Sequence, residues 1–106
     1  MTGHPSGPAR APVMPNAGRI RGQVVSVRPE ADGRGTTWEV AIRDVQDVPG
    51  MANFARSYQG GTVALFVHPG LTGRAGVHDT ITAKVAFRGD EHGGRFVVVD
   101  DDLHKE

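Results

Sequence analysis

Histidines, serines and carboxylates are the residues of this 106-residue chain whose types could do chemistry, so their spacing is the first question. A catalytic serine needs a histidine and a carboxylate close by. Ser26 on a predicted strand and Ser57 in a predicted helix have no such partners at a recognisable spacing. The loop of residues 89–94 places two acids and a histidine together, but polar loops flanked by glycine are typical of hairpin turns. We therefore expect a protein that is not an enzyme and needs no cofactor.

The five histidines do not form a metal-ligand pattern within the chain. The four that follow residue 60 lie in separate loops or strand ends, without the short spacing that preorganises a site. His4 differs, because removal of Met1 would leave Thr-Gly-His at the amino terminus. The free amine, two amide nitrogens and an imidazole would then resemble a square-planar copper or nickel site. A metal carrier that uses His4 is the third of our functional hypotheses.

Composition excludes several further classes of protein. The 12 basic and 12 acidic residues cancel, so no global field draws the chain to nucleic acid or to an anionic membrane, and any basic patch must be local. The chain has no cysteine, which excludes disulfides, thiolate zinc sites and cysteine nucleophiles. No apolar run approaches the about 20 residues of a membrane span, and no secretory signal is visible. We expect a soluble cytoplasmic protein with no membrane partner.

Valine is the main structural signal, because 14 valines stand against three leucines and occur in short alternating runs separated by glycine. Side chains branched at Cβ fit a pleated surface, so this pattern predicts β-structure with little helix. Alternation places Trp38, Val40 and Ile42 on the inner face of one strand, and Gly22 marks a bulge or bend in another. We predict five strands, at residues 19–28, 36–43, 62–68, 80–88 and 95–99, the last of them covered on both sides.

The remaining segments divide the chain into three parts. Residues 1–18 hold four of the seven prolines and few large apolar side chains, so they are predicted to be a flexible leader. Residues 19–100 form a single predicted barrel domain, and residues 101–106 a polar acidic tail. Apolar spacing predicts one short helix within residues 50–59, whereas residues 69–79 are too rich in glycine for one.

Five short strands with a bent first strand favour a small closed barrel, since closure removes exposed sheet edges. The glycine-bent stretch 19–27, the alternating stretch 37–43 and the turn and strand of 76–85 resemble the OB-fold, a five-stranded Greek-key barrel. This resemblance covers about residues 19–100. OB-folds usually carry their helix between the third and fourth strands, whereas the helical pattern here follows the second. The strand order therefore stays open, with an SH3-like or other small barrel as the alternative.

The resemblance implies a binding face on the second and third strands, where OB-folds bind oligonucleotides or oligosaccharides. Phe66 is predicted to point outward there, and a ring beside an arginine could stack on a base. Our first hypothesis is therefore a non-enzymatic module that binds single-stranded nucleic acid. Its candidate residues are Arg21, Arg43, Phe66, His68 and Arg88. The alternative for this face is that Phe66 packs under residues 50–59 and the arginines are solvated.

The second functional hypothesis is a protein–protein interaction or oligomerisation module that binds no nucleic acid. Met51, Phe54 and Tyr58 share one face of the predicted short helix, at the spacing that lines residues up along a helix. Aromatic side chains and methionine are enriched at protein interfaces. These three residues are the predicted anchor for a protein partner or for a second copy of the chain.

Overall fold

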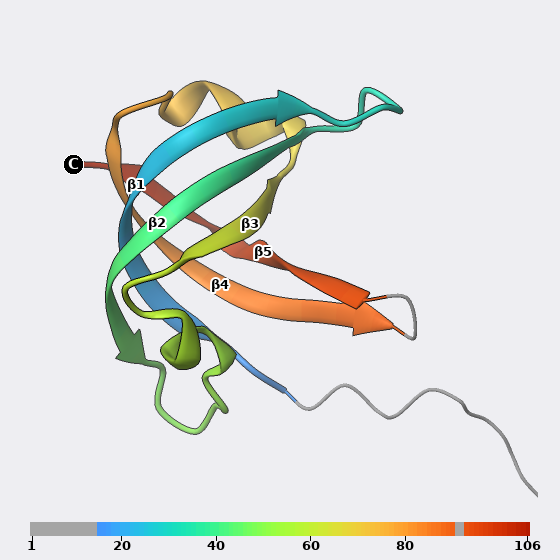
Figure 1. The fold of residues 1–106 in the computed structure, drawn as a ribbon. Helices are drawn as coiled ribbons and strands as arrows, with labels where there is room; N and C mark the ends of the chain where they lie inside the picture. Colours follow the sequence, from blue (N-terminus) through green and yellow to red (C-terminus); the bar gives the residue numbers. More distant parts are fainter. Residues whose placement is uncertain (1–14, 91–92) are drawn as a thin grey trace, which may run out of the picture.

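The structure is a computed structural model that describes residues 15–90 and 93–106. The described residues form these elements in order: β1 (Gly18–Pro29), β2 (Thr36–Asp47), η1 (Phe54–Tyr58), β3 (Thr62–Val67), η2 (Pro69–Arg74), β4 (Thr80–Asp90) and β5 (Gly93–Lys105), where η marks a 3-10 helix. The strands close into a barrel in the order β1-β2-β3-β5-β4 (Figure 1). Only the pairing of β3 with β5 is parallel. The predicted fold class, an all-β five-stranded barrel resembling the OB-fold, is confirmed.

The inward faces predicted from alternation fill the barrel. Trp38 is 0% exposed and sits among the inner side chains of every strand. The other inner residues of the strands are Ile20, Val24, Val40, Ile42, Val45, Val63, Leu65, Val67, Ile81, Ala83, Val85, Phe96 and Leu103. Burying one such large apolar side chain stabilises the folded state by about 1.5–3 kcal/mol. The core therefore lies where the alternation of valine and tryptophan in the sequence predicted it.

Strand β1 bends at Gly22, as the sequence predicted. The register between β1 and β2 shifts at Arg21/Gly22 and again at Val24/Ser26. A Cβ atom at Gly22 would lie 2.5 Å from the carbonyl oxygen of Ala41, so only glycine allows this approach of the two backbones. The bend lets a single strand pair with β2 along one edge and with β4 along the other, which closes the barrel.

The prediction that residues 101–106 form a polar tail is wrong, because residues up to Lys105 belong to β5. Leu103 pairs with Ala83 of β4 and is fully buried. Asp100 and Asp101 have positive φ angles of 57° and 53°, and the register between β4 and β5 shifts at this point. Aspartate tolerates this left-handed conformation better than most residues, so the two aspartates make a bulge after which the strand resumes.

The first half of β5 is less buried than predicted. Phe96 is 3% exposed, but Val97, Val98 and Val99 are only partly buried, so this run is not covered on both sides. The reason lies in the closed topology: one face of β5 points into the barrel and the other toward the outside. The continuous apolar run correctly predicted a strand here, but the prediction that both faces of the strand are buried is wrong.

The two 3-10 helices lie at opposite ends of the barrel (Figure 1). Helix η1 falls within the predicted helical segment 50–59 and buries Ala55. Helix η2 contradicts the prediction that residues 69–79 form none, because Pro69 starts it and Leu71 is buried in the core. So short a turn needs little intrinsic helix propensity when one leucine anchors it. A helical turn therefore does follow β3, as in OB-folds.

The prediction that a flexible leader extends to residue 18 is wrong at its carboxyl end, and residues 1–14 lie outside the described residues. Asn16, Ala17 and Gly18 are buried, so residues 16–18 belong to the folded body. The Asn16 Oδ1 accepts a 2.6 Å hydrogen bond from the Phe87 amide, and the Ala17 amide donates to Ala52. Across the described part of the chain, no helix has the length and apolar character needed to cross a bilayer.

Candidate functional site

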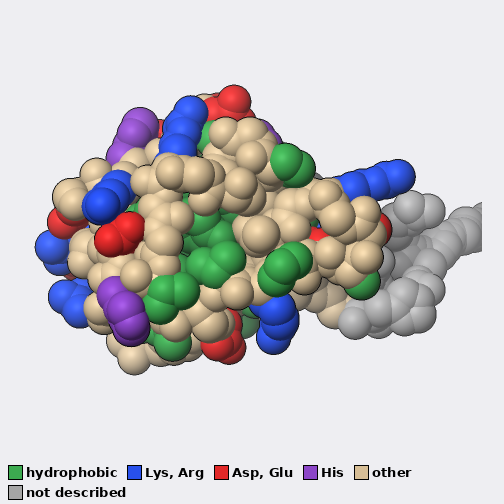
Figure 2. Space-filling view, turned by 90° about the horizontal axis from the view of Figure 1, so that it is seen from above, with side chains coloured by type: hydrophobic (Ala, Val, Ile, Leu, Met, Phe, Trp, Pro, Cys, Tyr) green, Lys and Arg blue, Asp and Glu red, His purple; other side chains and the backbone are tan. Residues whose placement is uncertain are grey.

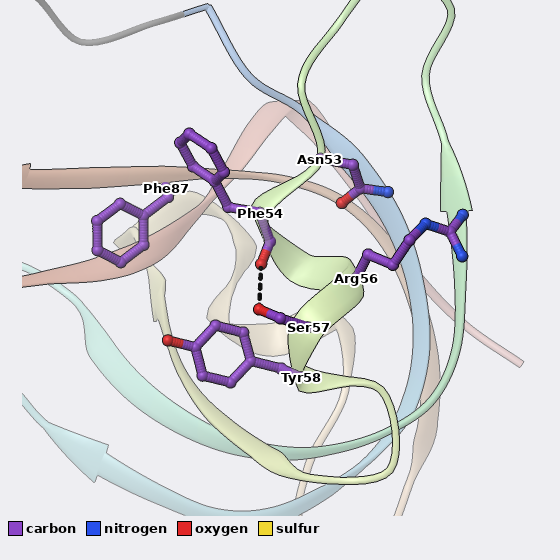
Figure 3. Close-up of a pocket in the computed structure, with 6 residues that line it drawn as sticks. All are labelled: Asn53, Phe54, Arg56, Ser57, Tyr58 and Phe87. Carbon is purple, nitrogen blue, oxygen red and sulfur yellow. Dashed lines mark hydrogen bonds between the residues drawn. The ribbon is translucent and has the colours of Figure 1, made fainter.

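An open groove of ≈ 580 Å³ lies between η1 and β4, and aromatic rings dominate it. We call it the aromatic groove. Its lining residues are Asn53, Phe54, Arg56, Ser57, Tyr58 and Phe87. Figure 3 shows the rings of Phe54, Tyr58 and Phe87 turned toward a common space, with the Arg56 side chain directed away from it. Phe54 is 40% exposed and Tyr58 44% exposed, so two large rings meet solvent in one place.

Local hydrogen bonds hold η1 in position beside the groove. The Asn53 Oδ1 caps the helix by accepting from the Ala55 amide, and its Nδ2 donates to the Gln46 carbonyl. Gly60 then reverses the chain with a φ of +85°, which favours glycine. The buried Ala55 methyl fixes the inner side of the helix in the barrel end. Phe54 and Tyr58, on either side of Ala55, are therefore held at the surface.

The groove rests on a continuous row of rings. Phe54 meets Phe87 edge to face with centroids 6.2 Å apart, and Phe87 meets Phe96 at 5.4 Å. Tyr58 meets Phe96 from the other side at 5.6 Å. Such edge-to-face pairs each contribute about 0.5–1.5 kcal/mol beyond burial of area. Since Phe96 is buried in the core, the exposed rings share a rigid base.

Two glycines let the Phe87 ring lie flat across the β4–β5 hairpin. Gly89 and Gly94 face each other in the ladder. A Cβ at Gly89 would lie 2.8 Å from the Phe87 Cε2, and one at Gly94 would overlap the ring. The ring therefore covers positions where other residues would carry side chains, and it reaches from β4 over β5.

The cation at the rim of the groove is already paired. The Arg56 guanidinium contacts Asp47 at 2.9 Å, and Asn53 also donates to that carboxylate. The Asn53 hydrogen bond, followed by the one from Arg56, lowers the pKa of Asp47 below its ordinary value. The rings themselves carry no charge, so the floor of the groove is suited to an apolar side chain.

The predicted nucleic-acid face is organised differently from the prediction. The arginine beside Phe66 is Arg95 of β5, whose guanidinium lies 4.2 Å above the ring centroid. Glu30 holds Arg95 at 2.8 Å. Glu30 also accepts a 2.5 Å hydrogen bond from Thr37. The hydrogen bond from Thr37, followed by the one from Arg95, lowers the pKa of the Glu30 carboxyl below its ordinary value.

Arg43 does not join Phe66 in one site. Phe66 pairs with Thr37 of β2, and Arg43 lies six residues farther along that strand. At about 3.3 Å per residue, the two side chains start roughly 20 Å apart. Arg43 donates instead to Gln23 on β1. Phe66 is also half-buried beside β5 and not under η1.

The other predicted contacts for nucleic acid are spread over the barrel. His68 contacts Asp101 at 2.9 Å, and Arg21 contacts Glu106 at 2.8 Å near the end of the chain. Arg88 pairs across the ladder with Arg95, which brings it toward the Phe66 side. In the space-filling view, positive and negative side chains are intermixed around a shallow hydrophobic hollow (Figure 2). The five predicted residues therefore do not form one positive surface.

The predicted protein anchor is largely brought together. Phe54 and Tyr58 both line the aromatic groove, whereas Met51, 43% exposed, precedes η1 and is not among the lining residues. The sequence prediction missed Phe87 as part of this site, because alternation along residues 80–88 places it on the inner face of the strand with Ile81 and Val85. Its place between Phe54 and the glycine pair depends on β4 lying beside η1, which no local pattern of residues predicts.

No cluster of three histidine, cysteine, aspartate or glutamate side chains that could hold a metal occurs within the described residues. His4 lies outside them. Comparison of the chain with protein-family models, with curated proteins and with solved structures finds no match. Function therefore has to be inferred from the groove and the face just described.

Proposed function

We propose that this chain is a non-enzymatic binding module whose aromatic groove takes up an apolar segment of a protein partner. The observation that carries the proposal is the exposure of Phe54 and Tyr58, 40% and 44%, over one groove with Phe87. Aromatic rings supply large contact areas and lose few rotamers on binding, so they often dominate the binding energy of interfaces.

Charge favours a protein partner over a nucleic acid at the groove. Binding to phosphates requires cations free to release counterions. Arg56, the cation among the lining residues, is paired with Asp47 and directed away from the rings (Figure 3). The chain as a whole has no net charge. Three neutral rings around one space instead match the desolvated centre of a protein interface.

The test is a selection of short random peptides displayed on phage against the folded chain, with binding of the selected peptides measured by fluorescence anisotropy. We expect enrichment of peptides with apolar residues. Phe54→Ala should weaken their binding about 30-fold, the effect of losing an interface anchor worth roughly 2 kcal/mol. Tyr58→Ala should act in the same direction.

The matched control is Phe66→Ala, which removes a ring from the other face of the barrel. It should leave peptide affinity unchanged, and circular dichroism should confirm that each variant is folded. Selection of no peptide above background, or equal losses in Phe54→Ala and Phe66→Ala, would contradict the proposal.

The Phe66–Arg95 pair favours a second candidate function, binding of single-stranded nucleic acid. A guanidinium 4.2 Å above a ring forms a flat platform on which a base can stack, and Arg88 lies across the ladder from Arg95. Each stacked base contributes about 1–3 kcal/mol. Against this, Glu30 neutralises Arg95, which weakens the attraction for phosphate.

Titration with a fluorescent oligothymidylate at low salt tests this candidate. Binding that weakens with added salt and is lost in Phe66→Ala, but kept in Phe54→Ala, would support it. Arg43→Ala should have little effect, because Arg43 lies at the far end of β2. An absence of binding at low salt would eliminate this candidate.

A further inference from the structure

One edge of the barrel is left without a neighbouring strand beside the aromatic groove. Strands β3 and β5 pair only at Leu65↔Phe96 and Phe66↔Val97. Before that point, Gly93, Gly94 and Arg95 pair with β4 on one side, and on the other side no described strand pairs with them. The β4–β5 hairpin projects from the barrel at this place (Figure 1). Its backbone groups on the free side are open to another strand.

The free edge is continuous with the groove. The Phe87 ring extends from β4 over Gly94, and Tyr58 meets Phe96 two residues farther along β5. A strand placed along residues 93–95 would therefore direct alternate side chains toward the rings, because successive side chains in a strand point to opposite faces. Main-chain hydrogen bonds would align such a strand, and the groove would select its side chains.

The other face of the same hairpin is basic. Arg88 and Arg95 are cross-strand neighbours, and both point away from the face that carries Phe87 and Phe96. Arg88 forms no ion pair with any described residue, and its guanidinium donates to the backbone carbonyl of Phe87. The outward side chains of an added strand would lie on the face that carries both arginines, where Glu30 already holds Arg95. An acidic residue on the strand would therefore complement Arg88.

We propose that the partner segment binds as an extended strand along Gly93–Arg95, with apolar side chains directed into the aromatic groove and acidic side chains directed toward Arg88. This inference rests on the proposed function and specifies its partner as a segment of alternating apolar and acidic residues. A second copy of the chain fits the edge poorly. In a two-fold pairing of residues 93–95 the second copy would supply only Gly93, Gly94 and Arg95, which offer neither an apolar side chain for the groove nor an acidic one for Arg88.

The probe is a synthetic peptide of alternating valine and glutamate, capped at both ends and titrated into the full chain. In an extended peptide the valine amides point to one edge and the glutamate amides to the other. Two analogues, N-methylated either on every valine or on every glutamate, therefore keep all side chains and block one edge each. We expect one analogue to bind like the parent peptide and the other to bind at least about tenfold more weakly.

Two further measurements belong to the same test. When the parent peptide binds, amide hydrogen exchange should slow at those amides of residues 93–95 that point away from β4. Arg88→Glu should weaken binding of the valine–glutamate peptide and strengthen binding of a valine–lysine peptide, which a merely structural role of Arg88 would not produce. Arg43→Glu is the matched control, since Arg43 lies at the far end of β2 and donates to Gln23 of β1.

The outcomes separate this inference from the proposed function. Equal binding of both methylated analogues, still lost in Phe54→Ala, would overturn strand addition and leave groove binding intact. If the valine–glutamate peptide does not bind while displayed apolar peptides bind the groove, the proposed alternation of apolar and acidic residues in the partner is overturned. A dimer seen by light scattering and abolished by the substitution Arg95→Glu in the β4–β5 hairpin would overturn the assignment of the edge to another protein. Absence of any peptide binding would overturn both proposals.

Discussion

Two aromatic surfaces of this barrel differ in what already covers their rings. In the aromatic groove, Phe54 and Tyr58 are anchored from below by Phe87 and Phe96, and their outer sides meet solvent. On the outer face, the ring of Phe66 is covered by Arg95. The comparison shows that an outward ring in a sequence pattern is not by itself a binding site. What matters is whether the folded chain supplies the ring with a partner.

The two surfaces meet at Phe96, which packs under the groove and pairs with Leu65 beside Phe66. Phe96→Ala removes the ring that supports both surfaces, so we expect it to cause the largest loss of stability among these variants. We expect a loss of about 3–5 kcal/mol in the free energy of unfolding, because a buried ring is replaced by a cavity. Urea denaturation measures it. Phe66→Ala, at a half-buried site, should cost clearly less, and equal losses would contradict the distinction between the two rings.

Gly94→Ala should damage the groove selectively. The new methyl would overlap the Phe87 ring, which must move away from β5. Overpacking of this kind typically destabilises by about 1–3 kcal/mol. Thermal unfolding gives the stability, and a displayed peptide gives the binding. Gly33→Ala is the matched control, since nothing lies within 4 Å of its Cβ position, although its φ of +74° adds local strain. Unchanged peptide binding in Gly94→Ala would show that the ring position is not needed.

Arg95→Ala should expose the Phe66 ring to solvent, as Phe54 and Tyr58 already are in the aromatic groove. The lost cation–π contact at an exposed site is worth about 0.5–1 kcal/mol of stability. With the ring uncovered, binding of a hydrophobic dye at this face should increase, and fluorescence measures it. Arg34→Ala serves as the control, because Arg34 lies in an exposed turn before β2. Equal dye binding in both variants would mean that Arg95 does not shield the ring.

Acid should weaken the second half of β5 but not the first, and we expect this loss of stability to be the smallest of the four effects. The first half is held by rings, whereas the second is held by ion pairs such as Asp102 with Arg19 at 2.8 Å. The hydrogen bond from Arg19 lowers the pKa of Asp102 below its ordinary 3.8. The stability that this pair contributes is therefore fully present above pH 3.8 and is lost as the pH falls through the lower folded value.

Melting temperature as a function of pH tests the last prediction. Asp102→Asn should lower the melting temperature at neutral pH and flatten its fall in acid, because the group that takes up the proton is gone. Asp32→Asn, in the exposed β1–β2 turn, is the control and should keep the wild-type profile. A steep acid loss that persists unchanged in Asp102→Asn would place the responsible carboxylate elsewhere.

The sequence by itself determined the strands and the inner faces of most of them. Alternation is a local property, because successive side chains in a strand point to opposite sides, so Trp38, Val40 and Ile42 could be placed inside without knowing their neighbours. Gly22 likewise marked the bend of β1 from its immediate context. The closed barrel followed from the number and length of these strands.

Only the tertiary structure decided where the two aromatic surfaces lie. The partner of Phe66 proved to be Arg95, and the partner of Phe54 proved to be Phe87, each far away along the chain. The acidic stretch after Asp100 became part of β5, because Leu103 finds a buried position opposite Ala83. Such contacts depend on register and closure, which are set by all five strands together, and no local pattern of residues encodes them.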